Sequence, residues 1–458
     1  MGKQRKPELT FYPYSNHLVE DVLKPICSEH GGITQSLLVS PIKYPQDLDL
    51  KSVMTQMPAY HRVLINQHTE MQYHLCGYGA FYEEAIIRLV GEAIERYALM
   101  MAQSTMADKI RYASYDDVAR DGRVLPFEYL RPFSDADYEK LNRGNYKGLR
   151  RLERSDVVGW VKCPSLFEAG VEISIPAQMM FVGYKLNRER GEVPFCPGFS
   201  TGTAAHMTHG KALQNALLEV IEIDALMLHW YTKLTAPAVT IDNLTVASLI
   251  PKLFATDSRY EVLALDLRVM EAVEAHVFGS VLINKHDERP LVVFGAQGHL
   301  DPARAFYRGL MEATAIAFLG VYGPLYLPKD YFVSNSGSNF TDLDSNVAFF
   351  ASPDNASRKK EIIRRMVEGR KVLSGMKNYD TGEVEADTSR LVRQLSSVSE
   401  YGVYLDVTPP ESRSRGWKVM RVFLPELVTM CVPGVPYSEH PRMKAHGGIH
   451  NEYPHPLP

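Results

Sequence analysis

The fold is decided by two matching stretches, Glu92-Ala-Ile-Glu-Arg-Tyr-Ala-Leu-Met100 and Glu219-Val-Ile-Glu-Ile-Asp-Ala-Leu-Met227. They share the string E-x-I-E-x-x-A-L-M, from position 92 to position 219, at an offset of 127 residues. Ala85 and Ala212 keep the same offset upstream. Self-similarity of this kind is typical of a duplicated structural unit. Only two copies are legible, so the pattern favours one duplicated helix over a solenoid.

Helical periodicity surrounds both stretches and recurs once more along the chain. Apolar residues repeat at three- and four-residue spacing over 82 to about 101, 211 to about 231 and 303 to about 319, which predicts three helices. In the first helix, five apolar residues share the face that we expect to pack on the core: Ala85, Ile86, Leu89, Ala93 and Tyr97.

Short runs rich in β-branched and aromatic residues alternate with these helices. They predict strands at 157–161, 172–176, 179–182, 260–267, 278–283 and 290–294. Residues 333–345 are predicted as a polar loop, and 358–373 as a basic, helix-prone, solvated segment. The mixture predicts an α/β fold with mixed sheets. We expect residues 1–60 to form an N-terminal extension and 61–458 to form the main domain.

The composition excludes several classes of protein. Of the 458 residues, 45% are hydrophobic and 23% are charged, so the chain can bury a large core. The 54 acidic and 50 basic residues give a net charge of −4, which lacks the basic footprint of a nucleic-acid-binding protein. No apolar run is long enough for a transmembrane helix, and no apolar stretch follows the basic N-terminus as it does in a secretion signal.

The five cysteines are widely scattered and odd in number: Cys27, Cys76, Cys163, Cys196 and Cys431. Neither a disulfide framework nor a cysteine-built zinc site fits this spacing. We therefore expect a cytoplasmic protein. The chain contains no Walker-type GxxxxGK(S/T), which excludes a P-loop.

Charged residues line one side of each predicted helix. One interpretation is three surface helices with ion pairs that contribute about 0.3–0.5 kcal/mol each. The repeat favours a second interpretation, a buried site built from carboxylates. Both copies place paired glutamates inside strongly apolar helices, where carboxylates must pair or bind metal. Converging carboxylates and arginines suit Mg²⁺ held together with nucleotide phosphates. The three stripes are Arg88, Glu92 and Glu95 with Arg96 beside them; Lys211, Asn215, Glu219 and Glu222; and Arg304, Arg308 and Glu312.

Two further features have more than one interpretation. Ser200-Thr-Gly-Thr203 precedes the second helix and either caps it or meets an anion there. The chain ends in Tyr453-Pro-His-Pro-Leu-Pro458, whose alternating prolines give a stiff, extended tail. Such a tail can dock into a pocket, although a floppy terminus and an SH3-type ligand are alternatives.

Together these residues resemble the YcaO family over about residues 70–458. Residues 404–410 and 419–425 are similar to the family's late pair of strands. The resemblance implies the YcaO-like fold, with its two glutamate helices related by pseudo-symmetry. It rests on four ordered motifs: Gly77-Tyr-Gly79 followed by Gly91-Glu-Ala-Ile-Glu-Arg96; Ser200-Thr-Gly-Thr-Ala-Ala205 followed by Ala216-Leu-Leu-Glu-Val-Ile-Glu-Ile-Asp-Ala225; Arg308-Gly-Leu-Met-Glu312; and Pro454-x-Pro456-x-Pro458.

The resemblance implies an enzyme that uses ATP and Mg²⁺ to phosphorylate a backbone amide oxygen. In the azoline-forming branch, whose PxPxP ending is similar, a neighbouring Cys, Ser or Thr cyclises and phosphate leaves. Thioamide or macroamidine formation is an alternative within the family, and a non-catalytic scaffold subunit is a rival class. Position by position, the resemblance implies Glu92, Arg96, Arg308 and Glu312 for the nucleotide, Glu95, Glu219 and Glu222 for Mg²⁺, and Pro454, Pro456 and Pro458 as a catalytic tail.

Four positions depart from the family pattern. Tyr78 stands in place of a lysine, and Arg88 in place of a serine. Lys211 and Ile223 replace a glutamate and an arginine, so a phosphate contact is missing unless Arg88 or Lys211 restores it.

The resemblance also implies partners. No fused activating-enzyme-like domain is evident before residue 60, and such members resemble the D proteins of microcin- and streptolysin-type clusters. This implies a precursor-peptide substrate, a separate leader-binding, activating-enzyme-like protein and a flavin-dependent dehydrogenase.

Overall fold

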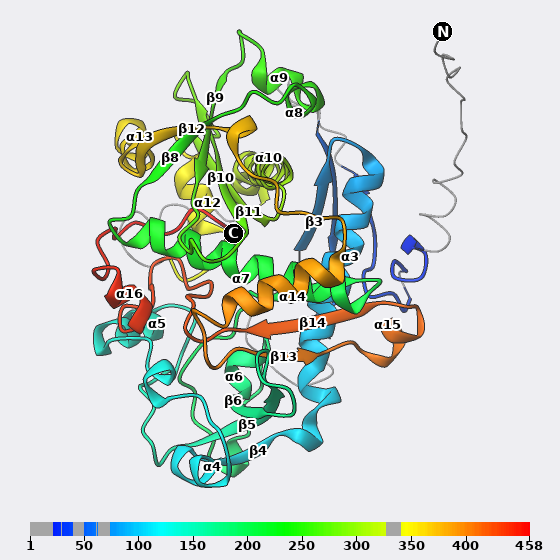
Figure 1. The fold of residues 1–458 in the computed structure, drawn as a ribbon, viewed down its shortest axis with the longest axis vertical. Coiled ribbons are helices and arrows are strands. Elements are labelled where there is room, and N and C mark those ends of the chain that lie inside the picture. Colours follow the sequence, from blue (N-terminus) through cyan, green and yellow to red (C-terminus); the bar gives the residue numbers. More distant parts are fainter. Residues whose placement is uncertain (1–21, 29, 40–49, 61, 63–73, 327–339) are drawn as a thin grey trace.

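The computed structural model describes residues 22–28, 30–39, 50–60, 62, 74–326 and 340–458, and strands from these ranges form four sheets (Figure 1). The strands are β1 (Leu38–Val39), β2 (Lys51–Gln56), β3 (His74–Gly79), β4 (Arg111–Ser114), β5 (Val157–Pro164), β6 (Glu172–Pro176), β7 (Thr203–His206), β8 (Ala236–Thr240), β9 (Tyr260–Asp266), β10 (His276–Asn284), β11 (Val292–His299), β12 (Val367–Val372), β13 (Val403–Asp406) and β14 (Lys418–Phe423). Their orders are β1-β2-β3, β4-β5-β6, β13-β14-β7 and β11-β10-β9-β8-β12. Strands β12 and β8 pair in parallel, and the other neighbours pair antiparallel.

Helices cover these sheets and connect them. Three are much longer than the rest: α3 (Tyr82–Thr105), α7 (His209–Tyr231) and α10 (Pro302–Tyr326). The others are α4 (Tyr115–Asp121), α5 (Asp135–Arg143), α6 (Ala177–Met180), α8 (Leu244–Leu249), α9 (Pro251–Phe254), α12 (Ser345–Ala351), α13 (Ala356–Arg365), α14 (Val384–Leu395), α15 (Pro410–Ser414) and α16 (Pro441–Ala445).

Each long helix follows directly on a strand. Helix α3 begins three residues after β3 ends, and α7 and α10 stand in the same relation to β7 and β11. Each helix packs on its own strand and also on the strand of the next unit: α3 contacts β7, α7 contacts β11, and α10 contacts β3. The three strand–helix units therefore close on one another.

Glycines allow this close packing. A Cβ on Gly77 of β3 would lie 1.9 Å from the carbonyl oxygen of Ala85 in α3. A Cβ on Gly295 of β11 would lie 2.3 Å from the carbonyl oxygen of Gly309 in α10. Because no side chain fits between strand and helix at these points, glycine is required there by space rather than by backbone conformation.

The α/β fold with mixed sheets is as predicted. The three predicted helices correspond to α3, α7 and α10, and the late pair of strands corresponds to the antiparallel β13 and β14. The predicted strands at 157–161, 172–176, 260–267 and 278–283 match β5, β6, β9 and β10, and that at 290–294 overlaps β11. Strands β1 and β2 come from the predicted N-terminal extension and join β3 in one sheet.

Three local predictions need correction or restriction. The strand predicted at 179–182 is wrong, because helix α6 ends at Met180 and a bend and turn follow at Phe181 and Val182. Met180 and Phe181 are nevertheless buried, and a short apolar run does not distinguish a helix from a strand. The basic segment 358–373 is helical only up to Arg365. It continues as edge strand β12, where Gly369 adopts a positive φ of 86° at a bulge. In the predicted loop 333–345, residues 333–339 lie outside the described part, and Ser345 already begins α12.

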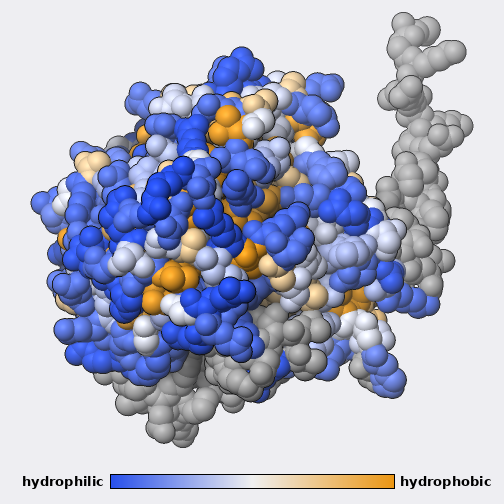
Figure 2. All heavy atoms as spheres, turned by 90° about the horizontal axis from the view of Figure 1, so that it is seen from below, coloured by the Kyte–Doolittle hydropathy of each residue, from blue (hydrophilic) through white to orange (hydrophobic). Residues whose placement is uncertain are grey.

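The surface offers few large apolar areas on the face shown in Figure 2, where hydrophilic residues predominate and apolar residues gather in small patches. Over the described ranges, no helix is both long and apolar enough to span a membrane. All five cysteines are free thiols.

Candidate active site

Glutamates from three helices meet where the strand–helix units close. Burial, and then the negative charge of Glu219, raises the pKa of Glu95 well above its ordinary value. Burial and then Glu312 do the same to the pKa of Glu222. Burial also raises the pKa of Glu219 and of Glu312 to about 7. The charge of Glu92 acts on both Glu95 and Glu312, so all five predicted glutamates belong to one cluster of repelling carboxylates.

Backbone N–H groups on or beside β7 and β11 orient three of these carboxylates. Each of the three uses its Oε2 as the acceptor, and among the described residues its Oε1 accepts no hydrogen bond. One oxygen is therefore fixed by the fold, while the other is available to a ligand. The bonds run from Gly202 and Thr203 to Glu219 at 3.1 and 3.2 Å, from Gly298 to Glu222 at 2.7 Å, and from Ala296 to Glu312 at 2.7 Å.

The two predicted arginines also lie at the cluster. Arg96 Nη1 donates to Ser200 Oγ at 2.9 Å, and Arg96 Nη2 lies 3.9 Å from Glu92 Oε1. The loop that contains Ser200 is thereby tied to α3, and Arg96 Nε is buried without a hydrogen-bond partner in the described structure. Burial and then the charge of Arg88 lower the pKa of Arg308, while Glu222 opposes that shift.

Tyr78 and Arg88, two of the departures from the family pattern, lie against each other. The Arg88 guanidinium lies 5.2 Å from the centroid of the Tyr78 ring. Arg88 Nη2 donates to Glu84 Oε1 at 2.8 Å, and Tyr307 Oη of α10 donates to Glu84 Oε2 at 2.9 Å. Burial raises the pKa of Glu312, and the positive charge of Arg88 opposes that rise. Arg88 therefore supplies positive charge to the cluster of glutamates. Glu84 orients Arg88, and Glu84 is a residue that sequence reasoning missed.

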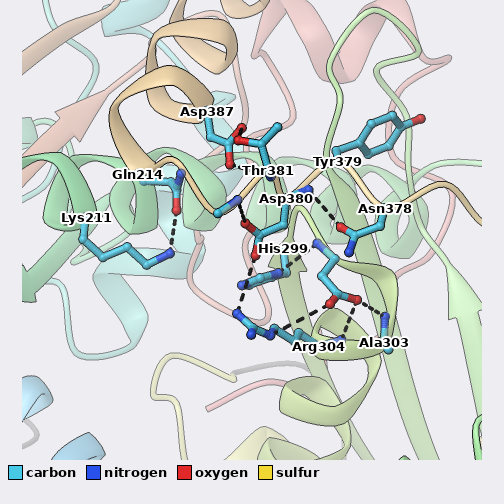
Figure 3. Close-up of polar contacts among 12 residues, drawn as sticks. Lys211, Gln214, His299, Ala303, Arg304, Asn378, Tyr379, Asp380, Thr381 and Asp387 are labelled. Atoms are coloured by element: carbon cyan, nitrogen blue, oxygen red, sulfur yellow. Dashed lines mark hydrogen bonds and ion pairs between the residues drawn. The ribbon is translucent and has the colours of Figure 1, made fainter. Parts of the chain in front are cut away.

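Lys211 lies near the N-terminal ends of α7 and α10, and Figure 3 shows its side chain directed at Gln214. Its Nζ donates to Gln214 Oε1 at 2.5 Å, and burial followed by the charge of Arg308 lowers its pKa. Burial, and then Arg308 and Lys211, lowers the pKa of His299 to about 4, so this imidazole is neutral near pH 7. The position of the missing family arginine, Ile223, is buried in the core and contributes no charge.

Arg421 of β14 is a second residue that sequence reasoning missed. It is only 2% exposed, and it donates to the carbonyl oxygen of Phe199 at 2.8 Å and to Thr203 Oγ1 at 2.9 Å. Burial lowers its pKa to about 10, and the charges of Glu219 and Glu95 oppose that shift. Arg421 thus holds the loop before β7 in place and faces two of the carboxylates. An arginine inside an apolar strand was the available signal.

The C-terminal tail packs at the C-terminal end of α7 and against α12. Pro454 and Pro456 are buried, Pro458 is half-buried, and the tail contacts the C-terminal end of α7, where Trp230 Nε1 donates to the carbonyl oxygen of Tyr453 at 3.0 Å. Tyr231 lies nine residues beyond Glu222, which is about 14 Å along a helix. The tail is docked in the interior, and its predicted catalytic role stays a prediction.

The donor set fits a magnesium nucleotide. The carboxylates are hard oxygen ligands whose mutual repulsion a divalent cation would relieve, and arginines lie beside them. Within the described ranges, no three His, Cys, Asp or Glu side chains are arranged to hold a metal ion by themselves. A magnesium ion at these glutamates would take its remaining ligands from nucleotide phosphates and water.

Comparison with solved structures gives the same fold at low sequence identity. A heterocyclase in complex with substrate and cofactor matches with a TM-score of 0.71 and 19% identity, covering 97% of this chain and 57% of that one. The YcaO protein from Methanopyrus kandleri bound with AMPPCP and Mg²⁺ gives 0.58 and 16%, covering 92% and 90%. A chain of the E. coli microcin synthetase McbBCD complex gives 0.60 and 13%, covering 92% and 96%.

Two of the structural neighbours are much longer than this chain. The chain spans only 57% of the heterocyclase bound to substrate and cofactor, and 50% of the heterocyclase TruD. A comparison with curated proteins gives no match.

A family model gives the decisive match. The model described as YcaO cyclodehydratase, ATP- and Mg²⁺-binding, matches residues 76–428, which include the three long helices and every predicted site residue except the C-terminal prolines. The chain therefore belongs to the YcaO family of ATP- and Mg²⁺-binding cyclodehydratases.

Proposed function

We propose that the chain catalyses the ATP-dependent cyclodehydration of Cys, Ser or Thr residues in a ribosomally made precursor peptide. The observation that carries the proposal is the cluster of five glutamates from α3, α7 and α10 in a chain of the YcaO family. The test is mass spectrometry of the peptide after incubation with the chain, its partners and Mg²⁺-ATP. Each ring removes the mass of one water, and an unmodified peptide would contradict the proposal.

The proposed reaction forms one ring per ATP consumed. The side-chain sulfur or oxygen attacks the carbonyl carbon of the preceding residue and loses its proton. The former carbonyl oxygen takes the γ-phosphoryl group of ATP, and ADP is released. That oxygen then leaves as inorganic phosphate while the amide nitrogen loses its proton, and the new C=N bond completes a thiazoline or oxazoline.

The site residues divide this work by their chemistry. Glu95, Glu219 and Glu222 would hold Mg²⁺, which neutralises phosphate charge when bound. Glu92, Arg96, Arg308 and Glu312 would hold and orient the nucleotide, with the guanidinium groups on phosphate oxygens. Arg88 and Lys211 add positive charge to the same region, in place of the missing cation at position 223.

The tail is proposed to orient the peptide for attack rather than to bind ATP. Prolines 454, 456 and 458 fix three φ angles, so the tail loses little entropy when it is ordered. Its burial against α7 and α12 supports a docked rather than a frayed terminus. The PxPxP ending favours azoline formation over thioamide or macroamidine formation.

A non-catalytic scaffold is the rival from another class. A scaffold gains nothing from burying repelling carboxylates, because each buried charge without a partner destabilises the fold. The five glutamates therefore favour the enzyme over the scaffold. Phosphate release by a Glu219→Gln variant separates these two interpretations.

The isolated chain is expected to turn ATP over slowly and to be stimulated by a separate leader-binding protein. The chain matches one chain of the microcin synthetase McbBCD complex over 96% of that chain, which supports a role alongside partner proteins. The measurement is phosphate release with and without the partner, at saturating peptide. Tight binding of the leader peptide by the purified chain alone would count against this expectation.

Binding of Mg²⁺-AMPPCP is expected to release protons and to tighten between about pH 6 and pH 8. Glu219, a proposed Mg²⁺ ligand, and Glu312, proposed to lie at the nucleotide, have pKa values of about 7, and a bound cation would favour their ionised forms. These values lie above the ordinary 4.5, so the folded chain binds more protons than the unfolded chain in this range. Stability without ligand should therefore fall as the pH rises from 4.5 through 7.

Calorimetry in two buffers of different ionisation enthalpy measures this proton release directly. Affinity that is independent of pH, with no protons released, would contradict the proposed role of Glu219 as a metal ligand.

A further inference from the structure

The last five residues present an unusual hydrogen-bonding surface. Positions 454, 456 and 458 are prolines, so only His455 and Leu457 carry backbone N–H groups. A protein that recognises this segment must therefore read mainly its carbonyl oxygens. His455 and Leu457 are 0% and 2% exposed, which shows that the tail is enclosed along this stretch.

Asn346 of α12 contacts two of these carbonyls at once. Its Nδ2 donates to the carbonyl oxygen of His455 at 2.7 Å and to that of Leu457 at 2.5 Å. One side-chain amide thus uses both of its hydrogens on carbonyls two residues apart. The opposite amide orientation would bring Oδ1 against the same two oxygens, so these contacts fix which way Asn346 points.

Asn346 satisfies two tail carbonyls while one of its own polar atoms stays unpaired. Asn346 is 0% exposed, and its Oδ1 is buried without a hydrogen-bond partner among the described residues. A buried polar atom without a partner destabilises the fold. The neighbouring Val347 and Phe350 of α12 are buried apolar residues, so an apolar residue would suit packing at position 346. What an apolar residue cannot supply is two donors aimed at the tail.

Other contacts fix the tail at the same register. The His455 N–H donates to Tyr231 Oη at 3.2 Å, and His455 Nε2 lies 3.0 Å from the carbonyl oxygen of Cys431. These contacts recognise His455 itself, whereas Asn346 reaches past it to the carbonyl of Leu457. Asn346 is therefore the contact closest to the chain end in this group.

We propose that Asn346 is a positioning residue that fixes the register of the C-terminal tail, so that Pro458 reaches one defined position during cyclodehydration. This inference rests on the proposed role of the tail in orienting the peptide. It names the residue through which α12 sets that orientation.

The test compares Asn346→Asp with a control of equal charge change. Asn346→Asp keeps the shape of the side chain, removes both donors and places a carboxylate against two carbonyl oxygens. Asn187→Asp is the control, because Asn187 Oδ1 accepts from the N–H of Arg190 and an aspartate can accept the same bond. Hydrogen exchange of the C-terminal peptide reports on the amides of His455 and Leu457, and ring formation and Mg²⁺-AMPPCP affinity are measured in parallel.

We expect exchange at these two amides to become at least about tenfold faster in Asn346→Asp, with unchanged nucleotide affinity and about a hundredfold slower ring formation, since small misplacements of reacting groups lose rate steeply. Asn187→Asp should behave like the wild type. In a chain that lacks residues 454–458, Asn346→Asp should slow ring formation no further, because its effect requires the tail.

Wild-type exchange at His455 and Leu457 in Asn346→Asp would overturn the inference. Full ring formation by the chain without residues 454–458 would instead overturn the proposed role of the tail. If Asn346→Asp does not fold, Asn346→Ser replaces it: one donor remains, so protection should be intermediate, and full protection would again overturn the inference.

Discussion

Replacing Glu219 with glutamine should leave the fold intact and reduce ATP turnover by about a thousandfold, as removal of a key electrostatic group at an active site does. Glutamine is nearly the same shape, and its carbonyl oxygen can still accept from the N–H groups of Gly202 and Thr203. The substitution also removes a negative charge that raises the pKa of Glu95, so stability should not fall. Phosphate release with peptide and partner present, together with the melting temperature, measures both effects.

The control for this variant is Glu361→Gln on α13. Glu361 is an exposed glutamate that pairs with Arg365 and lies outside the cluster, so the same chemical change there should leave turnover unaltered. Normal turnover by Glu219→Gln would remove its proposed role as a metal ligand and would favour the scaffold interpretation.

Deletion of residues 454–458 is expected to reduce cyclised product by orders of magnitude while changing ATP affinity little. The proposed tail orients the peptide, and misplaced reacting groups lose rate steeply. The residues proposed to hold the nucleotide are side chains of α3 and α10 rather than of the tail, so AMPPCP affinity should change little. Ring formation per folded molecule and AMPPCP affinity separate the two effects.

Deletion also removes the buried Leu457 and leaves Asn346 without its two acceptors, so some loss of stability is expected. Rates must therefore be normalised to the folded fraction. If the tail only packs the terminus, the folded, shortened chain will cyclise the peptide at the full rate, and this result would contradict the proposed role.

The central helices were predictable because their signal is local. Apolar residues at helical spacing in α3 and α7 report on the face that each helix buries, and the same spacing places Glu92 and Glu95, or Glu219 and Glu222, near one another. That these helices and α10 converge depends on how three strand–helix units pack. Composition and periodicity do not show which helices converge. The expectation that they converge came from the resemblance to a family.

The residues that were missed act through contacts distant in sequence. Arg421 reaches Phe199 and Thr203, more than two hundred residues away, and Glu84 accepts from Tyr307 across the site. Asn346 has no feature in the sequence that links it to the terminus. In each case the partner becomes visible only once the strands and helices are placed in space.

The central claim is that the carboxylates of α3, α7 and α10 form a metal–nucleotide site. Crystals of the chain grown with AMPPCP and Mn²⁺ test it most directly, because manganese can be located by its anomalous scattering. We expect a manganese peak within about 2.5 Å of a carboxylate oxygen of Glu95, Glu219 or Glu222, consistent with hard oxygen coordination, and nucleotide phosphates beside Arg308. Bound nucleotide and metal elsewhere, with none of these glutamates as a ligand, would contradict it.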